Sequence, residues 1–367
     1  MKKFVKMSLV TAVALTGLTS SVSANTLAEV ANNFDVFGYA QVRYDDSDVN
    51  GAKYTHKEVL GASGKLTDDI SYMFAGANLE IDDTSGAAPY SGVLMVYNYF
   101  TYTGIANTSI SAGKVGVDTP LTVVYDPATA TSEANGLSLT SKLGAVNLSA
   151  AYFANTNFNY GDTVGIFPGT TITGGESYIQ AGLNTKLGDV SLDGLYAQMD
   201  DRYKTYTLGA SGSIEAGSAK ITPSARYTAA DIDGSNSDQA LWKAGLKVQA
   251  GIVGASVDYG QTNKQGGWVT FDSDASANLK GWKVSLLGNK DSKLIKAGLN
   301  VDVMPKLNLS ANYVAMERKT TDVNEVYATA TYKIKKGLTA YVRMAQVDDD
   351  LNTEKETVGR ANILWLF

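Results

Sequence analysis

The side chains best suited to catalysis in this sequence are few and isolated. His56 is the only histidine, and the chain has no cysteine. A Ser/His/Asp triad would therefore have to use His56, and neither a thiolate catalyst nor a cysteine metal site is possible. The sequence also contains no G-x-S-x-G elbow, no Walker loop and no zincin helix. These observations predict that the protein is not an enzyme.

Basic residues form a more suggestive set, because they occur where every second residue is polar. Arg43 alternates with Gln41, and Arg360 alternates with Asn362. Successive side chains of a strand point to opposite faces, so such residues share the polar face of their strand. The basic residues that follow this rule most clearly are Arg43, Arg226, Arg343, Arg360 and Lys296. Four of the six arginines are in this set.

Alternation of this kind recurs along the whole chain in segments of about ten residues separated by turn residues. The clearest segment is "KLNLSANYVAM" at residues 306–316, which has one apolar and one polar face. Short connections alternate with long polar ones. The short ones include residues 67–69, 144–145, 188–189, 250–251, 304–305 and 335–337. The long ones are residues 46–55, 80–91, 116–135, 155–175, 200–203, 230–239, 262–291, 317–323 and 348–354.

Nine long and eight short connections predict 18 strands with both chain ends on the short-turn side. The segment 262–291 leaves the count open, since "WVTF" and "WKVSLLG" could be two further short strands, and 16 strands is the alternative. A soluble sandwich also alternates, but a sheet of about 18 strands normally curls or closes. The pattern therefore predicts an all-β fold, a transmembrane antiparallel β-barrel with long extracellular loops and short periplasmic turns.

The aromatic residues support this choice. Outward positions near the long-loop ends carry Tyr44, Tyr152, Tyr196, Tyr227, Trp242, Tyr259 and Tyr313. Aromatic rings of this kind gather where lipid meets water. The chain ends "RANILWLF", so Trp365 and Phe367 fall on the apolar face at the opposite boundary. Pairing of this last strand with the opening segment "FDVFGYAQVRYD" would leave no open edge in lipid.

The first 24 residues predict export. Lys2, Lys3 and Lys6 precede an apolar stretch that is too short to span a bilayer, and small residues follow up to Ala24. We expect residues 1–24 to be a cleaved signal peptide and residues 25–367 to form the barrel. The formal charge is −6, and loss of three lysines makes it −9. A negative chain argues against a nucleic-acid partner. The predicted location is the outer membrane.

The signal, the opening strand "VFGYAQVRYD", the alternating connections and the terminal Phe367 resemble those of general bacterial porins. Length and opening strand look most like the campylobacter-type major outer membrane protein family. This resemblance implies a homotrimer of water-filled diffusion channels with 16 or 18 strands and a third long loop that folds inward. It also implies that the strand ending in Phe367 is recognised by the barrel-insertion machinery. The partners expected are outer-membrane lipid and lipopolysaccharide.

Closure of the barrel would make the strands of Arg43, Arg343 and Arg360 neighbours and so build one basic column on the inner wall. The third long connection, residues 116–135, carries acids that could face this column if it folded inward: Asp118, Asp126 and Glu133. Opposed charges across a gap narrower than about 8 Å are poorly screened. They would orient polar solutes as these pass. The alternative is that both groups of charges are merely solvated.

These features favour a general diffusion porin, a passive route for ions and small hydrophilic solutes. The net charge favours a weak preference for cations. One alternative is a substrate-selective channel for sugars or anions, which would need an aromatic track or a denser ladder of lysines. Tyr327, Tyr341 and Phe153 have the right parity for such a track but are few. Another alternative is a surface adhesin or envelope-anchoring barrel that acts through its loops.

No cofactor is expected, with one open case. Asp45, Asp46 and Asp48 follow the opening strand, where oxygen ligands could hold Ca²⁺ or bridge to lipopolysaccharide through divalent ions. Their spacing matches no dedicated calcium loop, so the alternative is a set of solvated loop acids.

Overall fold

A single antiparallel β-sheet makes up the fold. The computed structural model describes residues 34–83, 90–124, 132–158, 175–233 and 238–367. The predicted signal peptide, residues 1–24, lies outside the described residues. Within the described ranges, no helix is long and apolar enough to cross a membrane.

The strands are long, and consecutive strands pair with each other. Their bounds are β1 (Phe34–Ser47), β2 (Gly51–Lys65), β3 (Ile70–Asp83), β4 (Tyr90–Ile105), β5 (Thr108–Gly116), β6 (Glu133–Leu143), β7 (Val146–Thr156), β8 (Tyr178–Leu187), β9 (Val190–Met199), β10 (Tyr203–Gly212), β11 (Ile214–Ala216), β12 (Ala219–Ile232), β13 (Gln239–Ala250), β14 (Val253–Thr262), β15 (Lys293–Met304), β16 (Leu307–Glu317), β17 (Asp322–Lys335), β18 (Leu338–Asp349) and β19 (Glu356–Leu366). Both β10 and the short β11 pair with β12, so these 19 segments make 18 crossings.

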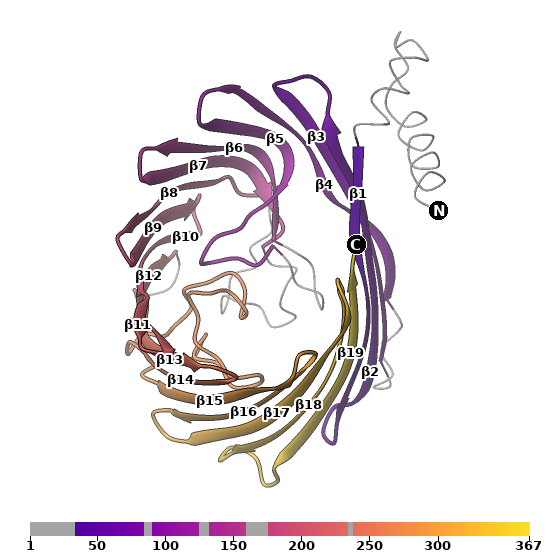
Figure 1. Cartoon of the computed structure of the whole chain (residues 1–367). Coiled ribbons are helices and arrows are strands. Elements are labelled where there is room, and N and C mark those ends of the chain that lie inside the picture. Colours follow the sequence, from indigo (N-terminus) through magenta and orange to yellow (C-terminus); the bar gives the residue numbers. More distant parts are fainter. Residues whose placement is uncertain (1–33, 84–89, 125–131, 159–174, 234–237) are drawn as a thin grey trace.

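The sheet closes on itself because β1 pairs with β19 as well as with β2 (Figure 1). At the end of this seam, the backbone N–H groups of Gly38 and Phe367 each donate to the other residue's carbonyl at 3.0 Å. A Cβ atom on Gly38 would lie 2.1 Å from the carbonyl oxygen of Val59, so only glycine fits there. The structure therefore confirms the predicted 18-stranded barrel, and the last residue takes part in the closure.

Several predicted connections are wrong in detail. Residues 46–55 do not form a long loop, because β1 runs to Ser47 and β2 begins at Gly51. The predicted connection begins within the polar run "YDDSDVN", but a strand that reaches beyond the lipid can carry polar residues on both faces. Residues 106–107 and 217–218 are short turns that the sequence analysis missed. The segment 263–292 contains no strand, only two isolated bridges.

The outer face of the barrel is largely apolar and is bordered by aromatic residues at both ends. Tyr44 and Tyr54 meet at 4.8 Å between ring centroids near the long connections. Trp365 and Phe367 meet at 4.8 Å at the opposite end. Between these borders the outward side chains are mostly Val, Leu and Ile, many of them around half exposed. This is the arrangement expected where a β-barrel meets lipid.

One part of the outer face departs from this pattern. His56, Glu58, Asn78 and Glu80 alternate with the inward residues of β2 and β3, so they face outward. His56 is opposite Glu80 in the register, and the Asn78 side-chain amide donates to Glu58 at 3.1 Å. His56 directly follows residues 46–55, which were predicted to be a long connection, and it lies within β2. A polar group facing lipid carries a free-energy cost, so this patch differs from the rest of the outer surface.

The two faces of the barrel can be distinguished by placing arginine on each. Leu299 of β15 faces outward and is 60% exposed, whereas the adjacent Asn300 lines a cavity inside the barrel. We expect Leu299→Arg to lower the free energy of unfolding from lipid vesicles by about 2–4 kcal/mol, the cost of a cation at the lipid face. Asn300→Arg is the control at nearly the same depth and should cost far less. Equal losses, measured by urea unfolding, would contradict the assignment of the two faces.

Candidate functional site

Two long connections fold into the barrel and fill part of its interior (Figure 1). They are the third, residues 117–132, of which 117–124 and 132 are described, and the seventh, residues 263–292. The backbone N–H of Phe271 donates to Leu121 at 2.8 Å, and that of Ala277 donates to Pro120 at 2.8 Å. The two connections therefore act as one inner layer against the wall.

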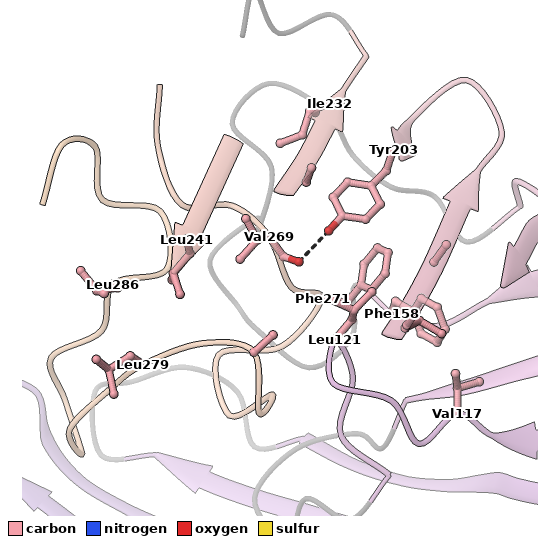
Figure 2. Close-up of a cluster of buried hydrophobic side chains, with 14 of the residues drawn as sticks. Val117, Leu121, Phe158, Tyr203, Ile232, Leu241, Val269, Phe271, Leu279 and Leu286 are labelled. Carbon is pink, nitrogen blue, oxygen red and sulfur yellow. Dashed lines mark hydrogen bonds between the residues drawn. The ribbon is translucent and has the colours of Figure 1, made fainter. Parts of the chain in front are cut away.

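An apolar cluster fixes this layer (Figure 2). Phe271 of the seventh connection packs against Phe158 at 4.9 Å and against Tyr203 at 4.8 Å between ring centroids. The hydroxyl of Tyr203 donates to the carbonyl of Val269 at 2.7 Å. Leu121 and Phe271 are at most 1% exposed. The interior around the two connections is thus a packed apolar core. Any passage is confined to the rest of the lumen.

Lysines of the wall add polar anchors. Lys243 of β13 donates to the carbonyl oxygens of Ser276 and Asn278, the latter at 2.7 Å. Lys296 of β15 donates to the carbonyl of Lys280 at 3.1 Å. Lys296 was predicted to line the pore, and it does face inward. Its ammonium group, however, is engaged with the seventh connection.

The basic column predicted from the closure of the barrel lies on β1, β18 and β19. The register places Arg343 opposite Arg360, and Arg360 opposite Asp45. On the other side, Arg343 is opposite Thr329 of β17 and its Nε donates to that hydroxyl at 2.9 Å. Four inward residues on consecutive strands therefore form one row: Thr329, Arg343, Arg360 and Asp45. The two arginines are at its centre. Like charges placed directly opposite each other destabilise a sheet unless something compensates them.

Most lumen arginines have a carboxylate partner, but Arg343 has none among the described residues. Asp45 accepts from Nε of both Arg43 and Arg360. Arg226 pairs with Asp193 at 2.8 Å and also donates to Thr207. None of the ion pairs between described residues involves Arg343, whose recorded hydrogen bond goes to the neutral Thr329. Arg343 therefore faces the lumen with its charge uncompensated by a described carboxylate.

Aromatic rings surround this guanidinium. The Cζ atom of Arg343 lies 5.2 Å from the ring centroid of Trp282, 5.6 Å from Tyr327 and 5.5 Å from Tyr341. The Cζ atom of Arg360 also lies 5.2 Å from Trp282. A cation within about 6 Å of an aromatic ring centroid is attracted to the ring. Trp282, which belongs to the seventh connection, therefore covers both central arginines of the row.

Glu133, one of the acids predicted to face this column, is engaged elsewhere. Glu133 is buried at the start of β6 and pairs with Lys114 of β5 at 2.8 Å. Asp118 is exposed in the connection, and Asp126 lies outside the described residues. The expectation that these acids oppose the basic column is wrong for Glu133. The acid that neutralises the column comes from its own wall, as Asp45.

The three carboxylates considered as calcium ligands, Asp45, Asp46 and Asp48, point in different directions. Asp45 faces the lumen, Asp46 faces outward, and Asp48 accepts from the backbone N–H of Thr357 at 2.9 Å. Among the described residues, no group of three or more His, Cys, Asp or Glu is arranged to hold a metal ion. Asp45 is instead an ion-pair partner, because a strand continues where a loop was expected.

On another part of the wall, β12 to β16 line a cavity of about 420 Å³ near their short turns. It is lined by Lys220, Thr222, Lys247, Ser256, Asn300 and Asn312, among others. Lys220, Thr222 and Lys247 belong to neighbouring strands, and Thr222 is opposite Lys247 in the register. The inner wall therefore carries basic groups at this cavity as well as at Arg343.

Two residues of the site were missed in the sequence. Trp282 stands in "GWKV", which was considered as a strand and not as an inward turn. Glu325 was not singled out, although its parity with Val323 and Tyr327 places a carboxylate on the inner face. A charge at an inward position beside apolar neighbours was the available signal. Only the folded connection reveals its partner.

Comparisons with known proteins agree with this architecture. The family model described as Gram-negative porin matches residues 249–352. No curated protein matches the chain. Similar solved structures include Pseudomonas aeruginosa OccK5 (OpdH), with a TM-score of 0.77, 14% identity and coverage of 92% of this chain and 98% of that one. P. aeruginosa OpdK with vanillate gives 0.75, 13%, 92% and 99%. P. aeruginosa OccK2 (OpdF) in complex with glucuronate gives 0.75, 13%, 92% and 98%.

The barrel, its apolar outer band and its charged lumen define an outer-membrane β-barrel with porin architecture. The protein lies in the bacterial outer membrane and is not an enzyme. The narrower resemblance to the campylobacter-type family is not confirmed by these comparisons, which support an outer-membrane porin in the broader sense.

The role of Asp45 can be tested by removing its charge. Asp45→Asn leaves Arg43 and Arg360 without their carboxylate, so the column gains one net positive charge. We expect the permeability ratio of chloride to potassium to rise roughly twofold, since fixed charges beside a narrow passage select the counter-ion. Reversal potentials in a KCl gradient across planar bilayers measure this ratio. The outward-facing Asp46→Asn is the control, and an equal ratio in both variants would remove Asp45 from the passage.

Proposed function

We propose that this outer-membrane channel is substrate-selective and carries small organic carboxylates inward. The observation that carries the proposal is the lumen-facing guanidinium of Arg343, which has no carboxylate partner among the described residues. The neighbouring Arg43 and Arg360 share Asp45 and are already neutralised in part. Among the arginines of the lumen wall, Arg343 is therefore the one where an anionic solute gains most.

The chemistry around Arg343 suits a carboxylate with an organic body. A guanidinium group offers parallel N–H donors that match the two oxygens of a carboxylate. Trp282, Tyr327 and Tyr341 surround the group with apolar ring surface, which limits competition from water. A chloride ion would use the charge alone. A carboxylate would use both the charge and the fork of donors.

The wall provides a second basic step on the route. Lys220 and Lys247 line the polar cavity on the side of the short turns. A solute that leaves Arg343 would meet them before it reaches the end of the barrel. Conduction requires sites that bind well enough to admit a solute and weakly enough to release it, and several moderate sites in series meet this need. In this proposal, Arg343 and the two lysines take the place of the denser ladder of lysines expected of a selective channel.

Two structural neighbours support the substrate class by analogy. Vanillate and glucuronate, which appear in the OpdK and OccK2 structures, are both carboxylates. The barrel covers nearly the same length of chain in those proteins and in this one. At 13% identity the likeness concerns the fold, so the residues that would bind the solute must be argued from this chain alone.

Uptake into proteoliposomes tests the proposal. Labelled glucuronate should enter vesicles that hold the purified protein faster than labelled glucose, a neutral sugar of similar size. Arg343→Gln should reduce the uptake of glucuronate roughly tenfold, the effect of losing one hydrogen bond to a charged group, and leave glucose unchanged. Arg343→Lys should restore part of the rate, because it keeps the charge and loses the fork.

Arg202→Gln is the matched control, since Arg202 pairs with Glu176 beside the β9–β10 connection and lies outside the column. Equal rates for glucuronate and glucose in the unmodified protein would contradict selectivity and leave a general diffusion porin. Little uptake of either solute would point instead to an adhesin or anchoring barrel whose lumen is closed.

Predictions about partners stay predictions. The homotrimer draws some support from the polar outward patch of His56, Glu58, Asn78 and Glu80, because a neighbouring protomer would remove these groups from lipid. Lipopolysaccharide contact and recognition of Phe367 by the insertion machinery rest on the resemblance described above.

A further inference from the structure

One buried carboxylate holds the seventh connection to the wall. The side chain of Glu325 on β17 faces the interior, and the residue is 0% exposed. Its oxygens accept from three consecutive backbone N–H groups: Trp282 at 3.1 Å, Lys283 at 2.9 Å and Val284 at 3.1 Å. Successive backbone N–H groups that converge in this way form a binding site for an anion. Here the anion is a side chain of the same protein.

The turn that supplies these groups is shaped for close approach. The backbone N–H of Gly281 donates to the carbonyl of Val284 at 2.7 Å and closes the turn. A Cβ atom on Gly281 would lie 2.2 Å from Oε2 of Glu325 and 2.7 Å from a methyl carbon of Val314. Only glycine therefore lets residues 281–284, called here the anchored turn, reach the carboxylate.

The recorded hydrogen-bond donors to Glu325 are backbone groups, and Lys296 acts on its charge only over a longer distance. None of the ion pairs between described residues includes it, and the nearby Lys296 donates to the carbonyl of Lys280. If the anchored turn left the wall, the carboxylate would lose three donors at once in a dry environment. Leaving a buried charge unpaired is strongly unfavourable. The attachment of the turn to β17 is therefore stronger than ordinary loop packing.

This attachment determines where Trp282 lies. Trp282 is the first of the three donors to Glu325, and its ring covers both Arg343 and Arg360 at 5.2 Å. Its backbone is thus bound to β17 while its side chain lies over β18 and β19. The anchored turn therefore contacts three consecutive strands of the wall, β17, β18 and β19.

We propose that Glu325 is a positioning residue that holds the anchored turn against the wall, keeps the passage open and sets Trp282 beside Arg343 as a determinant of selectivity. The inference rests on the proposed function only where it assigns Arg343 to solute binding. The mechanical part concerns the open channel in KCl alone, so it can fail or succeed independently of carboxylate transport.

Single-channel recording in KCl tests the mechanical part. Glu325→Gln retains the shape but replaces one acceptor oxygen by an N–H₂ group, which faces backbone donors. Gly281→Ala places a methyl group against Glu325 and Val314, so it pushes the turn away from the wall. The unmodified protein should give a steady open current. In each variant, brief closures should be roughly tenfold more frequent than in the unmodified protein, as expected when a charge-assisted hydrogen bond is lost. The double variant should resemble either single variant, because both changes break one attachment.

A chemical probe reports the turn directly. The chain has no native cysteine, so Val284→Cys introduces a unique thiol. Val284 is 5% exposed, and its backbone N–H can still donate to Glu325 after the change. A soluble maleimide should label this cysteine slowly in the native background and at least roughly tenfold faster when Glu325→Gln is added. The labelling requires no current, so it remains informative if a variant conducts poorly.

Glu317→Gln is the matched control, because Glu317 is an exposed carboxylate at the end of β16 whose nearest cation is Lys293 at 3.6 Å. It should change neither closures nor labelling. Retention of the folded barrel is checked by its resistance to unfolding in sodium dodecyl sulfate without heating. Steady currents and slow labelling in folded Glu325→Gln protein would overturn the inference. Normal carboxylate uptake alongside frequent closures would support the anchor and separate it from the choice of substrate.

Discussion

The lack of water in the hydrocarbon core of a membrane is the constraint on which this structure depends. Each backbone N–H and C=O group must find a partner within the sheet, so a sheet that spans lipid has to close without an edge. Here closure occurs between β1 and β19 and extends to the last residue, where Gly38 and Phe367 exchange two backbone hydrogen bonds. Once the cylinder is closed, the parity of each residue decides whether it meets lipid or the interior.

Inward-facing positions of the barrel are not all occupied by polar residues. Inward positions near the long connections are occupied by Tyr203, Leu241 and Val314, because the inward-folded connections need an apolar surface on which to pack. Inward positions further from those connections are Lys247, Asn300 and Asn312, which line a cavity. The barrel therefore contains two environments, a packed core around the connections and a wet passage. The basic row of Arg343 and Arg360 lies where they meet.

The strands and the closure were predictable because they depend on local periodicity, which each segment carries in its own residues. The placement of Arg43, Arg343 and Arg360 on neighbouring strands followed from closure alone. The contacts of the connections were not predictable in this way. Trp282 reaches Glu325 across 43 positions of sequence, through backbone N–H groups that carry no residue signature. Glu133 likewise pairs with Lys114 of the adjacent strand, diagonally across the register, although it was predicted to belong to an acidic loop.

The charges of the central row explain why one arginine stays available. Arg343 and Arg360 are directly opposite each other, and such a pair is repulsive unless it is compensated. Asp45 compensates from the side of β1, where it is already shared between two arginines. On the side of β17 the row ends in the neutral Thr329, and the ring of Trp282 stabilises both cations without neutralising either. A second acid at position 329 would complete the row and close the site to solutes. Because the row lacks that acid, the missing negative charge is the one that, in the function proposed above, a passing anion supplies.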